Sequence, residues 1–170
     1  MNIVFSTLNA RFSHSSLSLA SLASSCRERG AITIREYTIN QAHSEILADL
    51  FLLGPDVIGF SCYVWNIEET LRLCKDLKKV SPSLLIILGG PEVSFNAAEI
   101  MKRHSEIDFI VKGEGEAVLN HILGALGSRE GFAGVPGLCW RQEKGVCESE
   151  NLALVKDFGR LPLPAYEQLA

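Results

Sequence analysis

The sequence predicts an α/β protein in which helices cover both faces of a mainly parallel β-sheet. Short apolar runs rich in β-branched residues alternate with segments whose apolar residues recur at helical spacing. The run Leu84–Leu88 is apolar at every position, as a central strand must be when helices cover both faces of its sheet. The chain has 170 residues, 47% of them apolar, which is enough to bury a core.

Five strands are expected, and each is a short apolar run bounded by turn residues or by a helix. They span residues 2–6, 31–38, 56–61, 84–88 and 108–111. The expected helices span residues 15–29, 44–53, 67–80, 97–104 and 113–126. Gly30 marks the end of the first helix, and Asn66 is the expected N-cap of the third. This alternation predicts a doubly wound, flavodoxin-like (Rossmann-like) sheet of five parallel strands in the order 2-1-3-4-5.

The pattern changes after Gly127. Residues 137–141 and 146–148 predict a small C-terminal β-hairpin extension around Gly145. The run Leu161-Pro162-Leu163-Pro164 cannot continue a helix and predicts an extended linker. We therefore expect one domain over residues 1–128, with the hairpin and linker over residues 129–170.

Composition excludes several functional classes. With 16 Lys and Arg against 20 Asp and Glu, the net charge is −4, which argues against a nucleic-acid-binding surface. No apolar run approaches the roughly 20 residues that a membrane span requires. The five cysteines include no Cys-x-x-Cys pair, so we expect reduced thiols, no thiol-bound metal and a cytoplasmic location.

Candidate binding residues follow the ends of four expected strands, because ligands of open parallel sheets lie beyond the carboxyl ends of the strands. Glycines there would let backbone amides approach a flat ring or a phosphate, and aromatic residues could stack on a cofactor. Simpler roles stay open: a tight turn for the glycine pair, helix-dipole contacts for the glutamates, core or partner contacts for the aromatics, and a solvated charge for the arginine. The candidate cofactor-binding residues are Thr7, Asn9, Arg11, Ser61, Cys62, Tyr63, Trp65, Gly89, Gly90, Pro91, Glu92, Gly113, Glu114, Gly115 and Glu116.

The common enzymes of this fold do not match the sequence. A phosphoacceptor receiver needs an Asp at the end of the third strand, where this chain has Ser61. The loop after the first strand contains no glycine, which excludes a dinucleotide fingerprint, and there is neither a Gly-Lys-Ser/Thr phosphate loop nor a Gly-x-Ser-x-Gly elbow. Ser6 and Thr7 match a flavin phosphate turn only weakly, and no catalytic residue is predicted.

Three segments, DVIGFSCYVWN, LLIILGGPEVS and DFIVKGEGEAVL, carry a family resemblance. Together they resemble the cobalamin (vitamin B12)-binding domain that precedes the catalytic barrel of radical S-adenosylmethionine (SAM) enzymes, over residues 1–128. Leu161–Tyr166 resembles the connector into that barrel. The resemblance implies cobalamin as cofactor and a radical SAM domain in cis as partner. S-adenosylmethionine and a 4Fe-4S cluster would belong only to that downstream domain, because this chain lacks the Cys-x-x-x-Cys-x-x-Cys motif.

The chain departs from other cobalamin proteins at the lower axial ligand of cobalt. The Asp-x-His-x-x-Gly motif that supplies this ligand is absent, and His14 lies outside such a context. The resemblance therefore implies base-off cobalamin without a protein histidine on cobalt. Two alternatives remain: a degenerate interaction domain without cofactor, and a flavin- or nucleotide-binding module. By this interpretation the chain alone is not an enzyme, whereas the full-length protein would be a radical SAM enzyme.

Overall fold

The protein is built around one seven-stranded sheet, seen here in a computed structural model. The structure describes residues 1–170 except 12–14, 127–130, 144, 153–158, 160 and 165–170. The strand order is β2-β1-β3-β4-β5-β6-β7, with the first five strands parallel and the last two antiparallel. The strands are β1 (Asn2–Asn9), β2 (Ala31–Thr38), β3 (Val57–Ser61), β4 (Leu85–Gly89), β5 (Phe109–Val111), β6 (Leu138–Gln142) and β7 (Gly145–Glu148).

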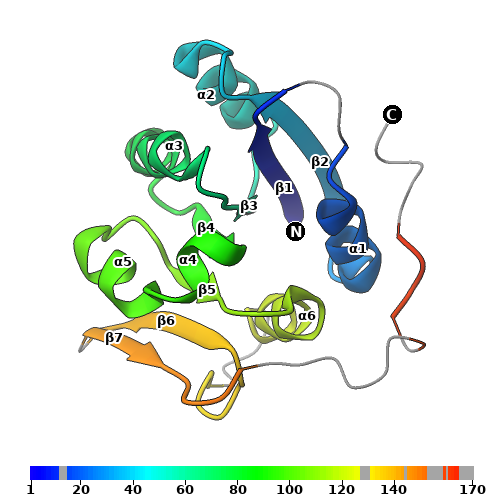
Figure 1. Ribbon diagram of the computed structural model, residues 1–170, viewed down its shortest axis with the longest axis vertical. Coiled ribbons are helices and arrows are strands. Elements are labelled where there is room, and N and C mark those ends of the chain that lie inside the picture. The colour runs from blue at the N-terminus through cyan, green and yellow to red at the C-terminus, as the bar shows by residue number, and fades with distance from the viewer. Residues whose placement is uncertain (12–14, 127–130, 144, 153–158, 160, 165–170) are drawn as a thin grey trace.

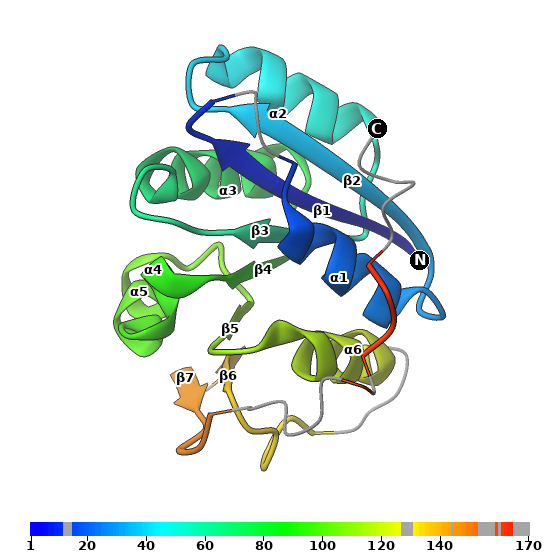
Figure 2. The same cartoon turned by 45° about the vertical axis from the view of Figure 1, so that its right-hand side comes forward.

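Helices cover both faces of this sheet, as Figures 1 and 2 show. One face carries α1 (Leu17–Cys26) and α6 (Gly115–Ala125). The other carries α2 (His43–Leu52), α3 (Ile67–Val80) and α5 (Ala97–Arg103), with the single turn α4 (Pro91–Ser94) after β4. Within the described part of the chain, no helix is long and apolar enough to cross a membrane.

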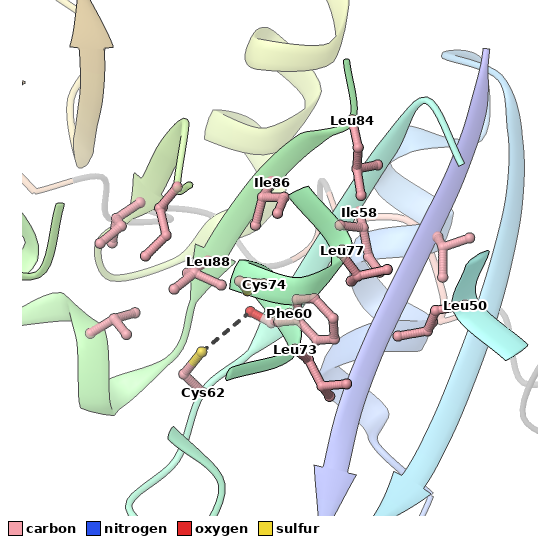
Figure 3. Packing of buried hydrophobic residues seen from close by; sticks show 14 of the residues in the cluster. Leu50, Ile58, Phe60, Cys62, Leu73, Cys74, Leu77, Leu84, Ile86 and Leu88 are labelled. Carbon is pink, nitrogen blue, oxygen red and sulfur yellow. Dashed lines mark hydrogen bonds between the residues drawn. The ribbon is translucent and has the colours of Figure 1, made fainter. Parts of the chain in front are cut away.

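The core consists of two apolar clusters, one on each face of the sheet. Successive side chains of a strand point to opposite faces, so Ile86 and Leu88 join the cluster under α2, α3 and α5, whereas Ile87 joins the cluster under α1 and α6. Figure 3 shows the first cluster, in which Leu73 and Leu77 of α3 lie close to the strands. Both faces are therefore buried, which explains the continuous apolar runs of the central strands.

The parallel core confirms the predicted order 2-1-3-4-5, but the predicted strand count was wrong. The hairpin joins the sheet: β6 pairs antiparallel with β5, with Val111 opposite Leu138. The Lys112 N–H donates to the Gly137 carbonyl over 2.7 Å and continues this pairing. The free edge of β5 would otherwise leave backbone groups unpaired, which is the physical reason for the longer sheet.

Element boundaries agree best where the sequence has clear stop signals. The expected strand 31–38 and helix 67–80 match the structure, and residues 161–164 lie in neither helix nor strand. The first strand is longer than predicted because β2 supports it up to the pair Asn9 and Thr38. The first helix is shorter, at Leu17–Cys26, and α4 was not predicted.

Candidate functional site

A cavity of about 290 Å³ opens at the carboxyl edge of the sheet, on the face covered by α1 and α6. We call it the edge cavity. Nine residues predicted from the sequence line it: Ser61, Tyr63, Gly89, Gly90, Pro91, Gly113, Glu114, Gly115 and Glu116. The lining residues that the sequence did not single out are Phe5, Ser18, Leu19, Leu22, Gly59, Phe60, Ile87, Leu88, Val111 and Leu119.

Two neighbouring strands carry a glycine on the face of the edge cavity, and the space beside one of these glycines is open. Ser61 pairs with Gly89, and Gly59 pairs with Ile87 two residues earlier in the ladder. A Cβ added to Gly89 would have only the Val111 carbonyl oxygen near it, at 3.8 Å, so the space beside this glycine is open. A Cβ at Gly59 would lie 3.0 Å from the Phe5 ring. A lone glycine inside an apolar strand often marks a close approach of this kind, and that signal could have identified Gly59.

Gly90 has a different role from Gly89. Its φ is +102°, a conformation that side chains of L-residues rarely adopt, and an added Cβ would lie 2.5 Å from the Cys62 carbonyl oxygen. The tight-turn explanation therefore accounts for Gly90. Gly89, in contrast, needs no unusual backbone and faces the edge cavity.

The apolar part of the edge cavity lies deeper in the fold than its polar part. Phe5 and Ile87 sit one or more residues inside the carboxyl ends of their strands, and Leu19, Leu22 and Leu119 face them from the helices. The polar lining residues lie at the strand ends and in the first turns of α1 and α6: Ser18, Ser61, Glu114 and Glu116. Such a site suits a ligand with an apolar ring and a polar portion nearer to solvent.

Glu116 also ties the two covering helices together. Its Oε1 accepts a hydrogen bond from the Ser21 hydroxyl of α1 over 2.9 Å. Close packing accompanies this contact, because a Cβ on Gly115 would lie 3.1 Å from a Leu22 methyl carbon. The start of α6 therefore supports the wall of the edge cavity. Glu116 links α6 to α1, so a contact with the helix dipole is not its complete role.

The two aromatic residues of the β3–α3 loop stack on each other. The rings of Tyr63 and Trp65 are 4.6 Å apart and inclined by 4°. Tyr63 lines the edge cavity and also a second cavity of about 520 Å³, which we call the loop cavity. Trp65, Asn9 and Arg11 line the loop cavity only, so the structure brings these three predicted residues beside the main site rather than into it.

Three predicted site residues line neither cavity. Thr7 is buried, and its hydroxyl donates to the Ser61 carbonyl over 3.1 Å. Cys62 is fully buried, and this burial raises the pKa of its thiol to about 12. Glu92 is exposed, with its N–H directed to the Cys62 carbonyl over 3.3 Å. His14, the remaining residue considered for this edge, lies outside the described residues.

Among the residues that the structure describes, no cluster of His, Cys, Asp and Glu side chains could hold a metal ion. His43 contacts Glu69 and Asp76 on the surface between α2 and α3, and His104 contacts Glu106. Neither histidine lines the edge cavity or the loop cavity. The described lining of the edge cavity consists of glycines, apolar side chains and a few polar side chains, and we call its glycine-lined part the cradle.

Comparison with known proteins identifies a family for the region that contains this cradle. Residues 4–123 match the family model described as "B12 binding domain". The chain is 26% identical over 154 residues to the uncharacterized methyltransferase PH0819 of Pyrococcus horikoshii, covering 90% of this chain and 34% of the relative. It is 32% identical over 92 residues to the cobalamin-dependent radical SAM methyltransferase TokK of Streptomyces tokunonensis, covering 54% of this chain and 14% of the relative.

A solved structure supports the same fold. The cobalamin-dependent S-adenosylmethionine radical enzyme OxsB, with aqua-cobalamin and S-adenosylmethionine bound, matches 96% of this chain with a TM-score of 0.81. The sequence identity is 20%, and the match covers 24% of the OxsB chain, so this likeness speaks for the fold alone. The chain thus spans about a third or less of these larger proteins.

Proposed function

The chain belongs to the B12-binding domain family, and from this premise we propose that it binds cobalamin at this sheet edge, with part of the cofactor in the edge cavity, and presents it to a radical SAM domain. The cavity between the covering helices and the glycines of β3 and β4 carries this proposal. It lies within the matched residues 4–123. The space beside Gly89 is open to a ligand, and the apolar side chains of Phe5, Leu19 and Leu22 would shield an apolar ring from water.

The stacked aromatic pair would form one side of the binding site. Tyr63 borders both cavities, so a ligand that fills them would contact its ring. The backbone at Gly89 and Gly113 would approach the ligand without obstruction by side chains. Bound cobalamin would supply a cobalt-centred methyl or other group for transfer, and the residues of this chain would orient it and exclude water around it.

We propose further that cobalt carries no histidine of this chain. The sequence contains no Asp-x-His-x-x-Gly motif, and the described residues of the first loop that border the loop cavity include Asn9 and Arg11 but no histidine. Electron paramagnetic resonance of the Co(II) form tests this proposal, because a coordinated nitrogen splits the signal. A nitrogen splitting that disappears in a His14→Ala variant would contradict it.

A radical SAM domain in cis is the proposed partner. The relatives that match this chain are much longer, and TokK is by name a radical SAM enzyme. Apolar side chains also surround the carboxyl edge in exposed positions, with exposed fractions of 74% for Val64, 47% for Trp65 and 89% for Phe95. Exposed apolar groups in this number are typical of surfaces that another domain covers. S-adenosylmethionine and a 4Fe-4S cluster would then belong to that domain.

The state of the cysteines supports the cytoplasm as the place of action. All five are free thiols, and four of them are buried. Unpaired cysteines in this number are typical of proteins from a reducing compartment. We therefore propose a cytoplasmic location for the cofactor-bound protein.

Titration of the 170-residue chain with hydroxocobalamin tests the proposed function. We expect saturable binding, retention through gel filtration and a changed visible spectrum. A Gly89→Leu variant should lose binding, because its side chain would enter the open space beside β4. Gly131→Leu is the matched control, since Gly131 is exposed and an added Cβ would meet nothing within 4 Å. Equal affinities of both variants and the parent would exclude the edge cavity as the site.

A further inference from the structure

The side chain of Asn66 is fully buried and does not cap the helix that it precedes. An Asn in this N-cap position usually accepts a hydrogen bond from an N–H group of the first helical turn. Here Oδ1 instead accepts from the Tyr63 N–H over 2.8 Å. The Nδ2 group faces three oxygen atoms of two strand ends: Leu8 O at 3.0 Å, Ser61 O at 3.1 Å and Thr7 Oγ1 at 3.3 Å.

This amide lies where the order of the strands reverses. From β1 the chain goes first to β2 on one side and later to β3 on the other, and ligands of such sheets bind beside this reversal. The ladder between β1 and β3 ends at the pair Ser6 and Phe60, while β1 continues to Asn9. Asn66 joins the two strands beyond their last ladder pair, and so it fixes how far their ends separate.

The same amide controls the position of both aromatic rings. Its Oδ1 accepts from the Tyr63 N–H, while the backbone N–H of Asn66, which is not part of the amide side chain, donates to the Tyr63 carbonyl over 3.0 Å. The indole N–H of Trp65 donates to the Leu8 carbonyl over 3.3 Å, which is the carbonyl that Asn66 also contacts. The Leu8 carbonyl therefore accepts hydrogen bonds from both the Trp65 ring and the buried Asn66 amide.

We propose that Asn66 is a positioning residue for cobalamin: it holds the Tyr63–Trp65 loop in the arrangement that forms the common wall of the edge cavity and the loop cavity. This inference rests on the proposed function. Asn66 lines neither cavity, so it acts through the loop and not by touching the cofactor. Loss of the amide removes the acceptor of the Tyr63 N–H and takes one of two donors from each of the Leu8 and Ser61 carbonyls. The loop should then rearrange so that water can reach these groups.

The test uses Trp65 as a fluorescent reporter. The chain contains two tryptophans, so the fluorescence of Trp140 must be removed. The Trp140 indole N–H has no hydrogen-bond partner among the described residues, so Trp140→Phe removes this fluorescence without breaking a hydrogen bond of the indole. In this background we compare Asn66→Ala and Asn66→Asp. Asn96→Ala is the matched control, because Asn96 also precedes a helix, α5, but is exposed. Far-UV circular dichroism gives the temperature range in which each variant is folded.

In folded Asn66→Ala we expect roughly tenfold weaker binding of hydroxocobalamin, which corresponds to the loss of about one buried hydrogen bond. The anisotropy of Trp65 emission should fall in the free protein, whereas Asn96→Ala should match the background in both measurements. In Asn66→Asp one carboxylate oxygen can still accept the hydrogen bond from the Tyr63 N–H. The other oxygen replaces the NH₂ donor and faces the Leu8 and Ser61 carbonyls, which are also acceptors. Protonation restores one donor, so its affinity relative to the background should recover in part as the pH falls from about 8 to 5.

Unchanged affinity in folded Asn66→Ala would overturn the proposal, and so would weaker binding with unchanged Trp65 anisotropy. If Asn66→Ala does not fold, the nearly isosteric Asn66→Asp decides, and lack of any pH-dependent recovery would count against the proposal. Failure of the unsubstituted chain to bind cobalamin would refute the proposed function instead. The Trp65 anisotropy of the free variants would still show whether Asn66 holds the loop.

Discussion

Replacing Gly90 by alanine should destabilise the whole fold, although the change adds a single methyl group. Gly90 has a φ of +102° and a ψ of 171°, a backbone conformation essentially restricted to glycine, and an L-residue there costs on the order of 1–2 kcal/mol. The new Cβ would also lie 2.5 Å from the Cys62 carbonyl oxygen and 2.9 Å from the Cys62 nitrogen. These contacts are with backbone atoms, so rotation of a side chain cannot relieve them.

The movement of Cys62 would disturb two backbone hydrogen bonds. Its N–H donates to the Gly89 carbonyl over 2.7 Å, and its carbonyl accepts from the Glu92 N–H over 3.3 Å. Weakening them adds about 1–2 kcal/mol, which brings the loss of unfolding free energy to roughly 2–4 kcal/mol. For a domain of this size the melting temperature should fall by roughly 4–16 °C.

Urea unfolding followed by far-UV circular dichroism measures this loss, with an unchanged slope against urea concentration. Gly89→Ala is the control on the neighbouring residue, because its Cβ would have only the Val111 carbonyl oxygen near it, at 3.8 Å. Its stability should stay within about 0.5 kcal/mol of the parent. Equal midpoints for Gly90→Ala and the parent, or equal destabilisation by both variants, would refute the argument from backbone conformation.

Two further predictions concern cysteines and a surface carboxylate. Iodoacetamide at about pH 8 should alkylate the partly exposed Cys147 first, because burial protects the other four thiols and raises their pKa values; uniform labelling in a mass spectrum would contradict this. The hydrogen bond from Lys79, and next that from His43, lowers the pKa of the Asp76 carboxyl group in the folded state. The ionised Asp76 therefore stabilises the fold fully at pH values above its unfolded pKa of about 3.9, and this stabilisation is lost as the pH falls through the folded pKa. The difference in urea midpoint between the parent and Asp76→Asn should therefore shrink below about pH 4, and a constant difference would exclude this linkage.

The sequence alone was sufficient for the order of strands and helices, because that order depends on local periodicity and on turn residues. The helix 67–80 begins after Asn66 and the strand 31–38 begins after Gly30, and both agree with the structure. The spatial order 2-1-3-4-5 was expected from the flavodoxin-like fold, because the alternation of elements alone does not fix the order of the strands. The glycine and aromatic residues after the strands were also recognisable, and most of them line one of the two cavities.

Only the tertiary structure decided which side chains face the edge cavity. Thr7 and Cys62 belong to the predicted strand ends, yet they are buried, while Gly59 was not predicted and lines the cavity. For Cys62 the cause is the two-residue period of a strand: it lies on the same face as Ile58, opposite the cavity, whereas Gly59 shares the face of Ser61. Thr7 shares the face of Phe5, but its hydroxyl is hydrogen-bonded to the Ser61 carbonyl. Leu22 of α1 reaches the cavity only because α1 packs beside α6, which lies about 90 residues later in the chain. The sequence by itself thus determined the elements and indicated the sheet edge where the edge cavity lies, whereas long-range pairing and packing determined the shape of that cavity.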